Sequence, residues 1–172
     1  MPTSIPAVSD GTRVPGNADL GAADMTARPS EIFAPDHVRI SAELDRRQME
    51  GRPTIHISMH SFTPVFGGVK RPWQVGLLYH RDSRLAHAKL ATLRTDPVLT
   101  VGDNEPYAVS DATDWTIPVH GEQRRILHVG IEIRQDLITQ PEGQSEWGAR
   151  MAAILPRALA LCSGGGVDLQ HP

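Results

Sequence analysis

Two side chains in this sequence stand where they could do metal or acid–base chemistry. His60 follows the short run 54–59, in which apolar and polar residues alternate as in a half-buried strand. Glu132 lies between two isoleucines in the apolar run 126–134. A carboxylate in a buried strand is unfavourable unless it is paired or functional. These positions indicate a metal ligand or general base at His60 and a proton acceptor at Glu132.

Each of these residues also has a structural interpretation. A histidine at the end of a strand can simply be hydrogen-bonded, and Glu132 can form an ion pair with Arg134, two residues further along the same strand face. His56 shares a face with His60, but four residues along a strand span about 13 Å, too far to share one small ion. We therefore interpret His56 as a hydrogen-bonded core histidine and His128 as an ordinary strand residue.

The elements that must position these side chains alternate between strands and helices, which predicts an α/β fold with a mixed, largely parallel central sheet flanked by helices. We expect strands at 54–59, 73–80, 97–102 and 126–134, and helices at 36–50, 82–94 and 142–162. Pro156 should kink or break the last helix. In such sheets, ligands collect at the carboxyl ends of strands, so we expect His60 and Glu132 to face one cleft, with the Asp103–Asn104 pair at a third strand end.

Two stretches have little regular pattern. Residues 1–34 are rich in turn-forming residues, which predicts a tail or a segment that wraps over the domain. A long loop follows the third strand, at 103–125, and loops of that length are uncommon unless they are functional.

Composition excludes several classes of protein. The chain has 172 residues, of which 40% are hydrophobic and 22% charged, so we expect a single domain over 1–162 and a flexible tail at 163–172. A formal net charge of -3 and a pI near 6.2 argue against nucleic acid or an anionic membrane as partner. The single cysteine excludes a multi-cysteine zinc site. Without a hydrophobic leader or spanning segment, the expected location is cytoplasmic.

Several longer motifs carry a family resemblance. They occur in the order "HSFTPVFGG", "RPWQVGLLY", "GDNEPY", "DATDWTIPVH" and "IEIRQDLI", preceded by "SDGTRVPGN" and "RPSEIFAPDHVRI". Over about residues 3–155 the sequence resembles the N-formylglutamate amidohydrolase family.

The resemblance implies a fold similar to that of the zinc carboxypeptidases and aspartoacylase-like deacylases, a phosphorylase/hydrolase-like architecture. It implies hydrolysis of N-formyl-L-glutamate, or a related N-acyl amino acid, to formate and glutamate by a zinc-bound water, a reaction of histidine degradation. By the same resemblance, His60 matches the third zinc ligand and Glu132 matches the general base.

The substrate implied by the resemblance is a small dianion, so cationic and amide donors should line its pocket. The candidates for substrate binding are Arg71, Asn104, Tyr107, His120 and Arg134. Three of them have plain structural alternatives: Arg71 as a solvated loop charge, Asn104 as a turn former and Tyr107 as a packing aromatic.

The chain departs from the family pattern near its N-terminus. The family carries an upstream segment with an early histidine motif for the first zinc ligands and an Asn-Arg pair for a substrate carboxylate, whereas this sequence has no histidine before His37. His37 itself stands in "PDH", where the family has "PYH". We therefore expect the C-terminal two-thirds of the family fold, with self-association through an uncovered sheet. The alternative is a truncated, inactive paralogue that acts as a binding or interaction domain.

Overall fold

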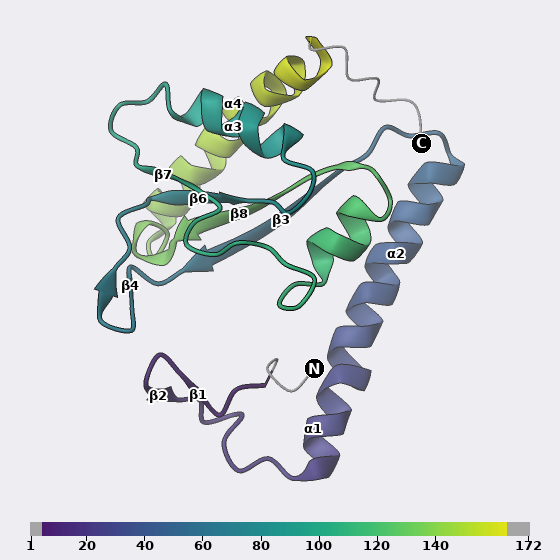
Figure 1. Cartoon of the computed structure of the whole chain (residues 1–172), viewed down its shortest axis with the longest axis vertical. Coiled ribbons are helices and arrows are strands. Elements are labelled where there is room, and N and C mark those ends of the chain that lie inside the picture. Colours follow the sequence, from purple (N-terminus) through teal and green to yellow (C-terminus); the bar gives the residue numbers. More distant parts are fainter. Residues whose placement is uncertain (1–4, 165–172) are drawn as a thin grey trace.

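A computed structural model describes residues 5–164 of the chain, and its centre is a four-stranded sheet (Figure 1). The strands follow the order β3 (Ile55–Phe62), β8 (Leu127–Arg134), β6 (Val75–Leu78) and β7 (Val101–Asp103). The outer pairs β3–β8 and β6–β7 are parallel, and the central pair β8–β6 is antiparallel. The predicted α/β fold with a mixed, largely parallel sheet is confirmed.

One face of the sheet carries the main core. The residues of β8 alternate between its two faces, and Val129 and Ile131 pack with Leu77 of β6 against two helices. These helices are α3 (Arg84–Leu93) and α4 (Pro141–Gly164), which contact each other and lie together on this face (Figure 1). Leu85 and Ala158 are fully buried where the helices meet the strands.

The opposite face carries the polar side chains and is covered by the chain between β7 and β8. A π-helical segment, η2 (Thr116–Glu122), lies over this face, and a small second core of Leu78, Val109 and Ile117 holds it there. Gly121 of η2 sits directly on His128: a Cβ atom at position 121 would be only 2.5 Å from the His128 ring. The side chain of Glu122 accepts hydrogen bonds from the backbone of Arg81 and Asp82, which ties η2 to the loop after β6.

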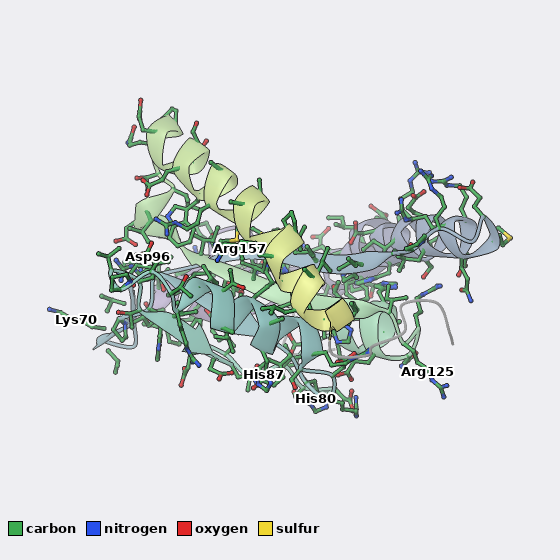
Figure 2. The ribbon with its side chains drawn as sticks, turned by 90° about the horizontal axis from the view of Figure 1, so that it is seen from above. Lys70, His80, His87, Asp96, Arg125 and Arg157 are labelled. Carbon is green, nitrogen blue, oxygen red and sulfur yellow. The ribbon has the colours of Figure 1, made fainter. Side chains whose placement is uncertain are left out.

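The N-terminal part of the chain forms an arm with little buried surface of its own. Its elements are β1 (Val8–Ser9), β2 (Thr12–Arg13), α1 (Ala22–Arg28), η1 (Pro29–Phe33) and α2 (Ala34–Met49). The three helical segments run on from one another as a rod at one side of the molecule, away from α4 (Figures 1 and 2). Leu44 is the buried residue of α2.

The arm contacts the body at η2, through α2, and at a second short hairpin. This hairpin consists of β4 (Val65–Phe66) and β5 (Val69–Lys70), and Lys70 projects outward from it (Figure 2). In the turn between β4 and β5, the backbone N–H of Gly67 donates a hydrogen bond to the Asp10 carboxylate of the arm. The remaining element is the short 3₁₀ helix η3 (Gln135–Leu137) after β8.

Several predicted boundaries were wrong. The first central strand continues through His60 to Phe62, because β8 pairs with it over its whole length. The third strand is confined to 101–103, and the predicted loop 103–125 contains η2. Residues 22–33, expected to lack structure, are helical. Pro156 lies inside α4 without breaking it.

The C-terminal helix also extends to Gly164, beyond the predicted start of the tail; positions 165–172 of that tail lie outside the described residues. No helix within residues 5–164 is both long enough and apolar enough to cross a membrane.

Candidate functional site

The register of the two parallel strands places His60 beside Glu132. Their Cα atoms are direct partners in the β3–β8 ladder, so the two side chains leave the same face of the sheet on strands about 4.8 Å apart. Both side chains line one cavity of about 860 Å³. The structure therefore brings together the two residues singled out from the sequence, and their chemical roles stay predictions.

Two glycines lie in register with His60 and Glu132 on the neighbouring strands, and they leave room for the segment after β7 to pass over the sheet. Gly76 is the partner of Glu132 in β6, and Gly102 is the partner of Gly76 in β7. A Cβ atom at Gly76 would lie 1.8 Å from the carbonyl oxygen of Glu105, and one at Gly102 would lie 2.7 Å from it. Because both positions lack a side chain, the segment after β7 packs directly on the sheet and brings Tyr107 to the cavity wall.

Glu132 carries a buried carboxyl group. Only 7% of the residue is exposed, and its Oε2 atom has no hydrogen-bond partner among residues 5–164. Burial raises the pKa of Glu132 to about 7; the Arg71 guanidinium lowers the pKa in part, and Asp114 raises it further. A carboxyl group with a pKa near neutrality can take up and release protons under physiological conditions.

The alternative interpretation of Glu132 as the ion-pair partner of Arg134 was wrong. Arg134 Nε lies 2.8 Å from Asp136 Oδ1, and its Nη1 atom reaches the backbone carbonyls of Arg71, Pro72 and Trp73. These contacts fasten the end of β8 to the start of β6. A direct contact between Arg134 and a substrate stays a prediction.

His60 has a hydrogen-bond partner on its own strand. The Oγ atom of Ser58, two residues earlier on the same face, lies 2.7 Å from His60 Nε2. Ser58 also lines the cavity. The hydrogen bond occupies one ring nitrogen of His60 and leaves Nδ1 as the nitrogen that remains for another ligand.

Arg71 is a buried cation next to this cavity. The residue is 9% exposed, and its guanidinium carbon lies 4.6 Å from the centroid of the Phe66 ring and 4.9 Å from that of Tyr107. Its Nη1 atom donates to the Tyr107 hydroxyl at 3.1 Å and to the Thr63 hydroxyl at 3.3 Å. Within the described part of the chain no carboxylate lies within ion-pair distance of Arg71. The interpretation of Arg71 as a solvated loop charge is therefore wrong.

Two other predicted substrate contacts lie elsewhere. Asn104 adopts a positive φ of 52°, and its Oδ1 atom accepts a hydrogen bond from the backbone N–H of Tyr79, which is the behaviour of a turn former. His120 is 1% exposed and does not line the cavity; its Nε2 atom is 2.7 Å from Nδ1 of His37. The substrate roles of Asn104 and His120 stay predictions.

Several cavity residues were missed from the sequence. His37 lines the cavity between the aromatic rings of Phe33 and Trp115, both of which also line it. Asp114 lies on the same wall. The strand alternation around His60 could have found Ser58, but no local pattern marks the others, because they come from the N-terminal arm and the irregular segment before η2.

A complete metal centre is absent from the described residues. Across residues 5–164, no group of three or more histidine, cysteine, aspartate or glutamate side chains could hold a metal ion. A catalytic zinc site takes three protein ligands. His60 and Glu132 alone do not meet that requirement.

Comparisons with known proteins agree with the family resemblance that the sequence motifs indicated. Residues 1–139 match the family model for N-formylglutamate amidohydrolase. The crystal structure of gene product Atu2144 from Agrobacterium tumefaciens superimposes with a TM-score of 0.85 and 37% sequence identity, covering 93% of this chain. This chain spans 63% of the length of the Atu2144 chain. No curated protein sequence matches it. Because the family model covers most of the sequence, the chain belongs to the N-formylglutamate amidohydrolase family.

Proposed function

We propose that this chain binds N-formyl-L-glutamate, or a closely related N-acyl amino acid, and provides the general base of an amidohydrolase. The proposal combines family membership with one structural observation. That observation is the buried carboxyl group of Glu132, whose Oε2 atom has no hydrogen-bond partner among residues 5–164; it shares a cavity with His60 and lies within electrostatic reach of the buried Arg71.

The environment of Arg71 supports an anionic ligand. A desolvated guanidinium is unfavourable without an anion, and cation–π contacts and neutral hydroxyl groups compensate it only in part. An arginine can bind a carboxylate through two parallel hydrogen bonds. Tyr107 lines the cavity and accepts a hydrogen bond from Arg71. A ligand carboxylate bound to Arg71 would therefore lie beside Tyr107, at the edge of the cavity.

Glu132 would then act on water. Its carboxylate accepts a proton from a water molecule as the water oxygen bonds to the acyl carbon. The same proton passes to the amide nitrogen as the C–N bond breaks, which gives a free carboxylic acid and the amino acid. A pKa near 7 suits both steps, because the group must first accept the proton and then release it.

The family implies a zinc ion, but the residues described do not fit it. One histidine, His60, and its neighbour Glu132 leave a catalytic zinc without the three protein ligands that it requires. This observation also favours a second candidate function, in which the chain binds the N-acyl amino acid without hydrolysing it.

Calorimetric titration with N-formyl-L-glutamate tests the proposal. We expect saturable binding to the wild-type chain and a loss of at least about tenfold in affinity for Arg71→Met, because a charge-assisted hydrogen bond contributes about 1.5–3 kcal/mol. Arg94→Met is the matched control, since Arg94 is exposed and pairs with Asp103. No binding to the wild-type chain would refute the proposal.

A formate-release assay in zinc-supplemented buffer separates the two candidate functions. Release that falls by about 10²–10⁴ in Glu132→Gln supports hydrolysis with Glu132 as general base. Binding without release supports the binding domain.

A further inference from the structure

His37 and His120 form a hydrogen-bonded pair that joins two segments 83 residues apart. Nδ1 of His37, on α2, lies 2.7 Å from Nε2 of His120, on η2. The ring planes are 18° apart and their centroids are 5.0 Å apart. At this distance between the two nitrogens, the N–H of one ring donates to the lone pair of the other.

The two rings have different surroundings. His37 lines the cavity, and its ring is held by an edge contact with Phe33, whose centroid is 4.2 Å away. His120 is 1% exposed, and its other nitrogen, Nδ1, is buried without a hydrogen-bond partner among residues 5–164. The pair therefore has one end in the cavity and the other in the protein interior.

His120 is neutral at physiological pH. Burial is the largest cause of its lowered pKa, which lies at about 4, and the neighbouring rings of His37 and His56 and the Arg124 guanidinium lower it further, while Asp36 acts in the opposite direction. A neutral imidazole carries one N–H and one lone pair.

The buried environment decides where that proton sits. A proton on Nδ1 of His120 would be a buried N–H donor without an acceptor, which is rare in folded proteins. With the proton on Nε2, His120 donates a hydrogen bond to Nδ1 of His37. The buried Nδ1 atom of His120 then carries only a lone pair, which lacks a donor among the described residues. His37 must then carry its own proton on Nε2, because its Nδ1 is the acceptor.

We propose that His120 fixes His37 as an Nε2–H donor, and that this N–H binds the acyl oxygen of an N-acyl amino acid in the cavity. The ligand assignment rests on the proposed function. Arg71 accounts for a carboxylate of such a ligand, and the Glu132 carboxylate cannot donate a hydrogen bond when ionised. The remaining acceptors of such a ligand are its second carboxylate and its acyl carbonyl, and a neutral N–H donor matches the neutral oxygen of the carbonyl. In this arrangement His37 would contact the ligand, and His120 would be a positioning residue.

The tautomers can be read directly by long-range ¹H–¹⁵N correlation spectra of protein labelled in the histidine rings. We expect both His37 and His120 to be in the Nε2–H form. In His120→Gln, where the amide nitrogen takes the place of Nε2, His37 should keep this form. In His120→Asn, where the amide nitrogen takes the place of Nδ1, His37 should average between its two tautomers. An Nδ1–H form of His37 in the wild-type chain would overturn the proposal.

The ligand assignment is tested by comparing two ligands. His37→Phe should weaken N-formyl-L-glutamate binding by about 3- to 10-fold, the effect of one hydrogen bond, and leave the binding of glutarate, which has no acyl amide, unchanged. His37→Gln, which keeps a donor near the position of Nε2, should restore most of the lost affinity. His87→Gln is the control, because His87 lies on α3, at the periphery of the molecule (Figure 2).

The outcomes separate the two proposals. Equal losses for both ligands in His37→Phe would mean that His37 shapes the cavity without binding the acyl oxygen, which would overturn this inference and leave the proposed function in place. If neither ligand binds the wild-type chain, the proposed function and the ligand assignment both fail, and the tautomer spectra alone decide the role of His120.

Discussion

Replacing Glu132 by glutamine should stabilise the metal-free chain at neutral and alkaline pH. The carboxyl group is 7% exposed and its Oε2 atom has no hydrogen-bond partner in the described part of the structure. Burial therefore raises its pKa from the ordinary 4.5 to about 7. Glutamine keeps the shape of the side chain and removes the ionisation.

The sign and size of the effect follow from proton linkage. Below pH 4.5 the carboxyl group is protonated in both the folded and the unfolded chain, so its ionisation does not affect stability. Between pH 4.5 and 7 the unfolded chain ionises first, and the folded state loses stability as the pH rises. Above pH 7 the loss is complete and amounts to about 3 kcal/mol, since one pKa unit is worth about 1.4 kcal/mol.

Urea unfolding in the presence of a chelator, at about pH 4.5 and about pH 8, measures this difference. The variant should be more stable than the wild-type chain by about 3 kcal/mol at the higher pH, and most of that gain should vanish at the lower pH. Glu31→Gln, at an exposed position of η1, is the control and should change stability by less than about 0.5 kcal/mol at either pH. A difference that does not depend on pH would show that Glu132 is solvated. A variant less stable than the wild-type chain at the higher pH would show that the carboxylate is paired with a cation.

Three further predictions concern packing, metal and association. Gly76→Ala should destabilise the fold by more than about 2 kcal/mol, because its Cβ atom would lie 1.8 Å from the Glu105 carbonyl oxygen. Gly148→Ala in α4, where a Cβ atom meets nothing within 4 Å, should instead stabilise it by about 0.5–1 kcal/mol; similar unfolding midpoints for the two variants would contradict the packing at Gly76. Dialysis against a mild chelator should leave well under one zinc per chain by metal analysis, because one histidine and one carboxylate cannot replace three ligands; stoichiometric zinc would reveal ligands that we have missed. Sedimentation velocity should show dimers or larger species, because β3 is an edge strand on which Met59 is 51% exposed, and Met59→Lys should reduce them; a monodisperse wild-type monomer would count against this.

Local sequence patterns predicted the presence of the strands better than their ends. The alternation of Ile55 and Ile57 with His56 and Ser58 correctly indicated a strand. Only pairing with β8, which is remote in the sequence, extends that strand to Phe62. The end of a strand depends on where its neighbour stops supplying hydrogen bonds, and a short window of sequence does not contain that neighbour.

The irregular regions were the least predictable. The stretch 103–125 was predicted as a loop because it has little regular pattern, yet it contains η2, which packs through Ile117 on the sheet face beneath it. Residues 1–34 are rich in turn-forming residues and were predicted to be a tail or a wrapping segment, yet helical turns run from α1 through η1, on both sides of Pro29. In both cases the lack of a local helical pattern did not prevent helical structure, because intrinsic propensity is a weak determinant beside tertiary context.

The sequence by itself determined the class of fold, the family and the two central side chains. Strand alternation placed His60 on the polar face, and the apolar surroundings of Glu132 marked it as a buried carboxyl group. These inferences about His60 and Glu132 depend on residues close together in the chain.

Only the tertiary structure decided how the other groups meet. The His37–His120 hydrogen bond, the contact of Arg71 with the Tyr107 ring and the burial of Glu132 all depend on segments far apart in the sequence. Which polar groups lose water, and which find a partner, is set by how the N-terminal arm and η2 pack on the sheet. Desolvation and pairing then set the protonation of these groups, so their chemistry follows from packing that no local pattern encodes.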